Sequence, residues 1–317
     1  MPRLRCAPML TWQDDERFEV GDTTFRAMLD REGVDYRPAA KRAVDAGDLF
    51  VAKPRWRIED YVQLLDRLRP QRIFELGIFL GGSAALFAEI ARPHRLVAID
   101  KRPQVHPLVA EYLTRRGLSD SVVMYGGVDQ WDTARLAEIA DEAFGEEPID
   151  LVVDDCSHRY KPSRASFNEL FPRLRPGGVY VIEDWPWAHA PVDTENDGPW
   201  SGQVPLTRLV FEVMLAIPGV PRLISGVEID SNSVSVTRGE AEVDRETFEI
   251  AACSKARGRD LLAPPPLGAS SGAQASLMAE AASMARVAGD RYSNRRVGAQ
   301  LPTIESSANR ADERDLG

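Results

Sequence analysis

Short apolar runs alternate with stretches of helical periodicity through the middle of this 317-residue chain. Continuous apolar runs are typical of strands buried on both faces, whereas apolar residues spaced three and four positions apart indicate helices that bury one side. The runs predict strands over 72–76, 96–99, 122–125, 150–153 and 179–182. The helical spacing predicts helices over 58–68, 83–91, 105–116, 133–144 and 164–174, with Ser83 as the N-cap of the second. Strands and helices that alternate in this way predict an α/β fold around a parallel sheet.

The pattern changes on both sides of this region. Residues 1–50 are mixed and charged, with weak helical periodicity around 24–30 and 39–46, and we treat them as an N-terminal extension. Residues 185–203 contain three tryptophans and three prolines without periodicity, which predicts a long loop. Beyond the loop, the spacing predicts a helix over 206–216 and strands over 226–229, 233–238 and 247–252, of which the first two are antiparallel.

The end of the chain has a different composition. Residues 263–317 begin with three prolines and are rich in alanine, serine, glycine and arginine. A helix fits 273–287, but such a composition buries little apolar surface and predicts disorder for most of the segment. The chain is thus divided into an extension over 1–50, an α/β domain over 51–262 and a low-complexity tail over 263–317.

Composition and charge narrow the classes of protein. The chain is 44% hydrophobic and 28% charged, as expected of a globular protein, and its net charge of -10 argues against a nucleic-acid partner. No apolar stretch approaches the ~20 residues that span a bilayer, so we expect no membrane insertion. The three cysteines are too scattered for a disulfide framework or a zinc site, and no signal peptide is evident. We therefore expect a cytoplasmic enzyme with a small-molecule substrate, for which a homo-oligomer remains open.

A glycine-containing turn separates the first predicted strand from its helix. Glycines in such a turn let the backbone approach a ligand closely, and the helix that follows attracts negative groups. Asp100 ends the next strand, where an acidic residue typically holds the ribose hydroxyls of an adenosine ligand. The candidate cofactor contacts of this region are Glu75, Gly77, Gly81, Ser83 and Asp100.

The spacing of the glycines helps to distinguish between two kinds of adenosine ligand. The spacing G-x-x-x-G-G departs from the G-x-G-x-x-G fingerprint of dinucleotide-binding proteins, and a glutamate precedes it. Acidic surroundings suit the cationic amino-acid end of S-adenosylmethionine better than a pyrophosphate, although an NAD-dependent oxidoreductase remains an alternative. Asp129 follows the third strand and would accept a hydrogen bond from the adenine amine, unless it is simply a solvated turn residue. Asp154 is also assigned to the cofactor side.

Acidic residues end the fourth and fifth predicted strands. Asp154 and Asp155 follow the fourth strand, and Glu183 and Asp184 follow the fifth. Because neighbouring parallel strands end at the same edge of the sheet, these groups should gather where α/β sheets bind ligands. Carboxylate oxygens are the ligands that Mg2+ prefers, so Asp155, Glu183 and Asp184 are candidate metal ligands. His158 lies beside them, and because histidine titrates near neutral pH it is the candidate general base.

These motifs together resemble class I S-adenosylmethionine-dependent methyltransferases. More narrowly, Asp-Asp-x-Ser-His at 154–158 with Ile-Glu-Asp at 182–184 is similar to metal-dependent sugar O-methyltransferases of natural-product biosynthesis. These include macrolide deoxysugar and rhamnosyl O-methyltransferases and the cephalosporin hydroxylase-like group. The resemblance covers about residues 53–254. It implies a doubly wound, mostly parallel seven-stranded Rossmann-like sheet with an antiparallel end.

The resemblance also implies a reaction. In that family the residues that match Asp155, Glu183 and Asp184 bind Mg2+, and the one that matches His158 is the proposed base. Gly77 and Asp100 match cofactor contacts, as does Ser83. We therefore expect methyl transfer from S-adenosylmethionine to a hydroxyl of a glycosylated metabolite. A phenolic or catechol acceptor is the alternative, because adjacent phenol oxygens also chelate Mg2+, and a non-catalytic cofactor-binding protein is a further one.

Overall fold

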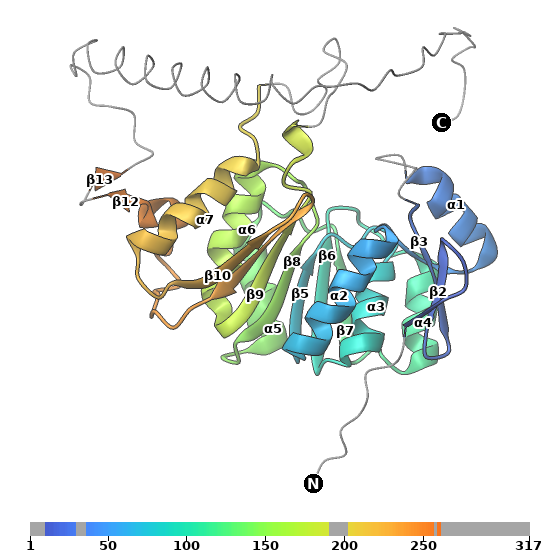
Figure 1. The fold of residues 1–317 in the computed structure, drawn as a ribbon. Coiled ribbons are helices and arrows are strands. Elements are labelled where there is room, and N and C mark those ends of the chain that lie inside the picture. The colour runs from blue at the N-terminus through green and yellow to red at the C-terminus, as the bar shows by residue number, and fades with distance from the viewer. Residues whose placement is uncertain (1–9, 30–35, 190–201, 257–258, 261–317) are drawn as a thin grey trace, which may run out of the picture. The chain divides into compact units, whose positions relative to one another are not determined.

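The fold is built on a seven-stranded sheet in the order β10-β11-β9-β8-β5-β6-β7 (Figure 1). The structure is a computed structural model that describes residues 10–29, 36–189, 202–256 and 259–260. Neighbouring strands from β9 to β7 are parallel, whereas β11 pairs antiparallel with both β9 and β10. This arrangement confirms the predicted doubly wound α/β fold with an antiparallel end. The strands are β5 (Arg72–Leu76), β6 (Arg95–Asp100), β7 (Val122–Gly126), β8 (Ile149–Asp154), β9 (Leu174–Glu183), β10 (Ile224–Ile229) and β11 (Ser233–Arg238).

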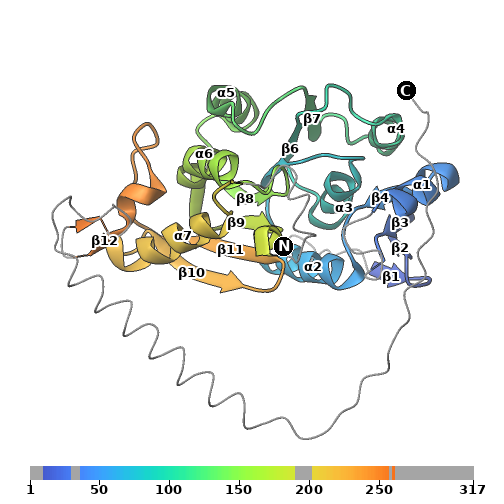
Figure 2. The same cartoon turned by 90° about the horizontal axis from the view of Figure 1, so that it is seen from above.

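Helices cover both faces of this sheet (Figure 2). Because side chains alternate along a strand, Ile73 of β5 packs in one core and its neighbour Phe74 packs in the other. The first core contains residues of α2, α3 and α4, and the second contains residues of α5, α6 and α7. The helices are α2 (Arg55–Leu68), α3 (Gly82–Ala91), α4 (Pro107–Arg116), α5 (Thr133–Phe144), α6 (Tyr160–Leu170) and α7 (Thr207–Gly219).

Most elements predicted between residues 58 and 252 lie where the sequence placed them, and three details in this region were wrong. Gly81, not Ser83, is the N-cap of α3, because the chain enters this helix with a left-handed residue (φ 83°). The helix predicted from residue 164 begins at Tyr160 and ends in a 3-10 turn, Phe171–Arg173. The strand predicted over 247–252 is instead a 3-10 turn, Ile250–Cys253.

The N-terminal region forms a second sheet that the sequence analysis missed. Its strands follow the order β1-β2-β3-β4, and α1 precedes β4. Phe18 and Phe25 of this sheet are buried in the same core as α2 and α3. The helix predicted over 39–46 is confirmed by α1, whereas the helical periodicity around 24–30 was wrong because β3 lies there. The elements are β1 (Leu10–Trp12), β2 (Arg17–Val20), β3 (Thr23–Ala27), α1 (Arg37–Ala46) and β4 (Leu49–Val51).

The remaining described elements are short. The 3-10 turn Trp187–His189 follows β9, and the two-residue strands β12 (Lys255–Ala256) and β13 (Arg259–Asp260) pair antiparallel. The tail over 263–317, with its predicted helix over 273–287, lies outside the described residues. Within the described ranges, no helix combines the length and apolar character needed to cross a bilayer.

Candidate active site

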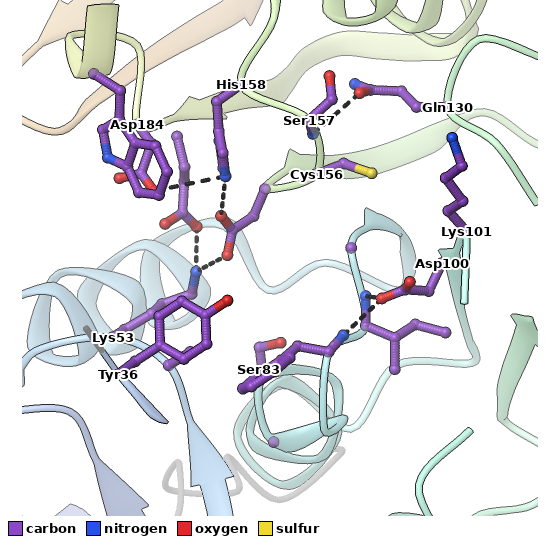
Figure 3. A pocket seen from close by; sticks show the side chains of 18 of the residues that line it. Tyr36, Lys53, Ser83, Asp100, Lys101, Gln130, Cys156, Ser157, His158 and Asp184 are labelled. Carbon is purple, nitrogen blue, oxygen red and sulfur yellow. Dashed lines mark hydrogen bonds and ion pairs between the residues drawn. The ribbon is translucent and has the colours of Figure 1, made fainter. Parts of the chain in front are cut away.

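A cavity of about 850 Å³ opens at the carboxyl ends of β5, β6, β8 and β9. Ligands of open α/β sheets bind at this edge. We call one side of the cavity the glycine-loop wall, formed by Gly77, Ile78, Phe79, Ser83 and Asp100. We call the other side the acidic wall, formed by Asp155, His158, Glu183 and Asp184. Both candidate groups of the sequence therefore line one cavity (Figure 3).

Gly77 brings the two walls into direct contact. Its φ is 104°, a backbone conformation that residues with a Cβ atom rarely adopt. A Cβ at this position would lie 2.1 Å from the backbone oxygen of Asp155. The backbone N–H of Asp155 in turn donates to the carbonyl of Leu76 at 2.9 Å. A glycine is thus required here for the approach of the two loops.

Asp100 is an ionised acceptor at the glycine-loop wall. Its Oδ2 accepts from the backbone N–H groups of Ile78 at 3.1 Å and Phe79 at 2.8 Å. Arg102 donates to the same oxygen from Nη2 at 2.8 Å. Burial alone would raise the pKa of Asp100, but the hydrogen bonds from Arg102 and the backbone hold it below its usual value. The carboxylate is therefore suited to accept from ligand hydroxyls.

Two predicted cofactor contacts lie behind this wall rather than on it. Ser83 lines the cavity, but Glu75 and Gly81 are not among the lining residues. Glu75 is buried, and burial raises its pKa to about 8, although a hydrogen bond from Ser83 opposes the shift. Gly81 packs against the side chain of Val109. Glu75 and Gly81 thus support the loop from behind.

Asp129 and Asp154 also differ in position. Asp129 lines the cavity, accepts from the backbone N–H of Trp131 at 3.0 Å and pairs with Lys101 at 3.0 Å. Asp154 is buried outside the cavity lining, where Gln130 Nε2 donates to its two oxygens at 2.7 and 2.8 Å. The side-chain oxygen of Gln130 accepts from the N–H of Ser157 at 3.3 Å. Asp154 therefore holds the loop that carries His158, against the prediction of a cofactor contact.

Three side chains of the acidic wall converge. Asp155, His158 and Asp184 each offer one atom, and these atoms lie within 4.8 Å of one another. His158 Nε2 is 3.9 Å from Asp155 Oδ1 and 3.8 Å from Asp184 Oδ2 (Figure 3). The other ring nitrogen, Nδ1, is buried and has no hydrogen-bond partner within the part of the chain that the structure describes. The imidazole thus faces the two carboxylates through one nitrogen.

Both carboxylates that face His158 have a raised pKa. Burial and then repulsion from Glu183 raise the pKa of Asp155. Burial and then repulsion from Asp155 raise the pKa of Asp184 to about 6. Like charges that are brought together in a low-dielectric site raise each other's pKa in this way. An added cation would favour the ionised form of both groups.

Backbone strain coincides with the site. His158, Asp184 and Phe79 all have a positive φ, of 52°, 54° and 49°. A left-handed conformation costs a non-glycine residue about 1–3 kcal/mol and is enriched at functional sites. All three residues line the cavity. The fold therefore holds the base candidate and one carboxylate in conformations that their own sequence does not favour.

Lys53 is a residue of the acidic wall that the sequence analysis missed. It follows β4, and its Nζ donates to Asp155 Oδ2 at 2.6 Å and to Glu183 Oε1 at 2.7 Å (Figure 3). Burial alone would lower the pKa of Lys53, but the two carboxylates raise it well above its ordinary value. A lysine that directly follows a buried apolar run was the available signal, since the acidic residues were recognised by the same pattern.

Glu183 is bound on several sides, unlike its neighbour Asp184. Tyr61 donates its hydroxyl to Glu183 Oε1 at 2.5 Å, and Arg57 Nε lies 4.0 Å from Oε2. Burial would raise the pKa of Glu183, but Lys53 and Arg57 lower it. Glu183 was predicted as a metal ligand, yet it lies outside the group of three that converges on one point.

Aromatic side chains line the cavity, and one of them contacts the base candidate. Trp187 lines the cavity with its ring centroid 4.6 Å from that of His158. Trp185 instead donates from Nε1 to the carbonyl of Asp230 at 3.0 Å. Trp56 and Trp131 also line the cavity, and both are well exposed. The cavity therefore offers flat apolar surfaces next to the acidic wall.

The donor set of the acidic wall fits a hard divalent cation. Such ions prefer carboxylate oxygens and keep open positions for water or substrate. Asp155 and Asp184 supply two oxygens that point toward the same space as His158 Nε2. Burial and, after it, repulsion between the carboxylates raise the pKa of both groups, and a bound cation would offset both effects by favouring the ionised forms.

Comparisons with known proteins agree with this geometry. Residues 74–185 match a family described as a methyltransferase domain. The chain is 31% identical over 179 residues to 8-demethyl-8-(2-methoxy-alpha-L-rhamnosyl)-tetracenomycin-C 3'-O-methyltransferase of Streptomyces olivaceus, a match that covers 54% of this chain and 41% of that protein. It is 49% identical over 63 residues to demethylmacrocin O-methyltransferase of Streptomyces fradiae, covering 18% of this chain and 15% of the relative. The matches thus span less than half the length of these relatives.

A solved methyltransferase structure is also similar to the chain. The MycE methyltransferase from the mycinamycin biosynthetic pathway, in complex with Mg, SAH and mycinamycin VI, shares 26% sequence identity with the chain. That match covers 57% of this chain and 49% of MycE, with a TM-score of 0.45. Residues 74–185, which match the methyltransferase domain family, contain both the glycine-loop wall and the acidic wall, so the similarity to methyltransferases covers the segment that forms these two walls.

Proposed function

We propose that the chain transfers a methyl group from S-adenosylmethionine to a hydroxyl on the sugar of a glycosylated small molecule, with a divalent cation at the acidic wall. One observation carries the proposal: a single cavity is lined both by Asp100 with the glycine loop and by Asp155, His158 and Asp184. A cofactor held at the first wall would face an acceptor held at the second. The curated relatives named above are O-methyltransferases, and two of the matched relatives act on rhamnosyl tetracenomycins.

The residues of the glycine-loop wall would hold the cofactor. Asp100 would accept from the ribose hydroxyls, and Asp129 would accept from the adenine amine. Gly77 allows the two loops to approach each other, because a Cβ at this position would collide with the backbone of Asp155. Bound S-adenosylmethionine supplies the electrophilic methyl group.

The residues of the acidic wall would activate the acceptor. A divalent cation held by Asp155 and Asp184 supplies positive charge that makes a neighbouring hydroxyl easier to deprotonate. His158 would receive the proton at Nε2, the nitrogen that faces the two carboxylates. Trp187 packs against His158 and would exclude water from one side of the imidazole. Orientation and electrostatics together account for most of the acceleration expected of such a site.

The cofactor is tested by calorimetric titration of the full chain with S-adenosylmethionine and, separately, with NAD. Micromolar binding of S-adenosylmethionine without binding of NAD is the expected result. Binding of NAD alone would refute the methyl-transfer proposal, because the glycine-loop wall would then serve a different chemistry.

The acceptor is tested by methyl transfer to matched compounds. Rhamnosylated aromatic polyketides and their aglycones are incubated with labelled S-adenosylmethionine, with Mg2+ or with a chelator. We expect labelled product only from the glycosides and only with Mg2+. Methylation of the aglycone or of a simple catechol at a comparable rate would favour a phenolic acceptor instead.

A further inference from the structure

Lys53 places a permanent positive charge inside the acidic wall. Only 4% of its side chain is exposed, and its ammonium bridges Asp155 Oδ2 and Glu183 Oε1 (Figure 3). The two ion pairs, at 2.6 Å to Asp155 and 2.7 Å to Glu183, favour the charged form of the ammonium. A buried ammonium is stable only when it is paired in this way.

This charge divides the carboxylates of the wall into two kinds. Glu183 is in contact with Lys53 and Tyr61, with Arg57 close to its second oxygen. Among the salt bridges of the described residues, none joins Asp184 to a lysine or an arginine, and Asp184 accepts from the amide of Asn232 at 2.5 Å. Glu183, which the sequence predicts as a third metal ligand, instead contacts cationic and phenolic side chains.

Asp155 belongs to both kinds. One of its oxygens, Oδ2, accepts from Lys53 at 2.6 Å, and the other, Oδ1, lies 3.9 Å from His158 Nε2. Lys53 therefore fixes the rotation of this carboxylate and directs Oδ1 toward His158 and Asp184. A lysine can act in this way because its ammonium donates up to three hydrogen bonds.

We propose that Lys53 is an internal counter-ion that holds Glu183 and one oxygen of Asp155 away from the divalent cation and lowers the affinity of the site for it. The inference rests on the proposed function, since it concerns the cation site of the same wall. In this arrangement Asp155 Oδ1 and Asp184 Oδ2 are the carboxylate ligands, and Glu183 is a partner of Lys53. The affinity is lowered because a fixed positive charge repels a cation bound a few ångströms away.

The test measures Mn2+ binding to the full chain by electron paramagnetic resonance of the free ion. Lys53→Met removes the charge and keeps an unbranched side chain of similar length. We expect Lys53→Met to bind Mn2+ at least about tenfold more tightly than the unsubstituted chain. Adding Asp184→Asn to Lys53→Met should abolish this gain. Equal or weaker Mn2+ binding by a folded Lys53→Met variant would overturn the inference.

The matched control is Lys41→Met, because Lys41 is exposed on α1 and pairs with Asp45. It removes the same charge far from the cavity and should leave Mn2+ affinity unchanged. A similar gain in Lys41→Met would show a general effect of net charge and would also contradict the role of Lys53.

A second variant keeps the inference testable if Lys53→Met does not fold. Glu183→Gln should lose clearly less Mn2+ affinity than Asp184→Asn, since in this arrangement Glu183 contributes negative charge but no ligand atom. A loss as large as that of Asp184→Asn would make Glu183 a ligand and refute the inference.

Binding of S-adenosylmethionine, measured on the same samples, separates the two proposals. If the cofactor binds but neither the unsubstituted chain nor any folded variant binds Mn2+, the role of Lys53 is refuted while methyl transfer stands. If S-adenosylmethionine does not bind, the proposed function fails on its own ground, whatever the Mn2+ data show for Lys53.

Discussion

The carboxylates of the two walls differ in how far along the sequence their hydrogen-bond partners lie. At the glycine-loop wall, Asp100 is held by Phe79, which lies 21 residues away, and by Arg102, which lies two residues away. At the acidic wall, Lys53 is 102 residues from Asp155 and 130 residues from Glu183. The first wall is thus assembled within one βαβ unit, whereas the second depends on the packing of a distant segment.

This difference has an electrostatic consequence. The hydrogen bonds around Asp100 hold its pKa below the usual value. At the acidic wall the single ammonium of Lys53 is shared by two carboxylates, and the pKa of Asp184 is raised to about 6. The glycine-loop wall is therefore complete as an acceptor of hydrogen bonds, whereas the acidic wall retains unbalanced negative charge. The glycine-loop wall is therefore suited to ligand groups that donate hydrogen bonds, such as hydroxyls, and the acidic wall to a cation.

If the walls have separate roles, His158→Ala should abolish turnover without loss of cofactor binding. Removal of a general base typically lowers the rate by about 10²- to 10⁴-fold. Calorimetry should show S-adenosylmethionine affinity within about threefold of the unsubstituted chain. The control is His189→Ala, since His189 is exposed and contacts Thr207. Near-normal turnover of His158→Ala with the true acceptor would refute the assignment of the base.

Gly77→Ala should damage both walls at once. The added Cβ would lie 2.1 Å from the backbone oxygen of Asp155, and φ is 104°. We expect unfolding free energy to fall by about 2 kcal/mol or more, with weaker binding of S-adenosylmethionine and of Mn2+. Gly117→Ala is the matched control, because Gly117 has a φ of 66° and nothing within 4 Å of its Cβ position. Chemical denaturation measures the loss of unfolding free energy in both variants. The loss in Gly117→Ala reports the cost of the positive φ alone, and the additional loss in Gly77→Ala reports the steric clash with Asp155. Equal losses in the two variants would contradict the close contact between the walls.

Asp100→Asn should act on one wall only. Hydrogen bonds to a charged acceptor contribute about 1.5–3 kcal/mol, so S-adenosylmethionine affinity should fall roughly ten- to hundredfold. Mn2+ affinity should stay unchanged, because the acidic wall keeps all of its carboxylates. Parallel titrations with both ligands check the prediction. A comparable loss of Mn2+ binding would show that the walls are not independent.

The difference between local and distant contacts at the two walls also explains which site residues could be predicted from the sequence. The strands that end at Asp100, Asp154 and Glu183 are continuous apolar runs, so their positions and their common edge followed from local pattern alone. Gly77 and Asp100 were found for the same reason. The apolar run before Lys53 marks its position at the end of a strand, but no local pattern shows that it pairs with carboxylates more than a hundred residues away. The inward rotation of Glu183 toward Lys53, rather than toward Asp184, depends on that pairing as well.

The N-terminal sheet was missed for a different reason. Residues Thr23–Ala27 alternate between buried and partly exposed positions, which is the period of a strand. In so short a segment, with threonine and arginine between the buried residues, this period resembles weak helical spacing. The strand is fixed by its pairing with β2 and β4, in which Phe25 lies opposite Phe18 and Leu49. Tertiary contacts, rather than local preference, therefore decide this element.

Glu75→Gln should have the smallest effect on function, because Glu75 supports the glycine-loop wall from behind. Burial raises its pKa to about 8 in the folded chain, above the usual value of 4.5. Below about pH 4.5 both the folded and the unfolded states hold the proton, and the carboxyl does not disfavour folding. Between about pH 4.5 and 8 the unfolded state ionises first, so the chain with Glu75 loses stability as pH rises, on the order of 1 kcal/mol per pH unit. The glutamine does not ionise, so the variant should gain stability relative to the unsubstituted chain over this range. Urea unfolding at pH 5 and pH 8 measures the difference, and an identical pH dependence of both proteins would show that Glu75 is already ionised in the fold.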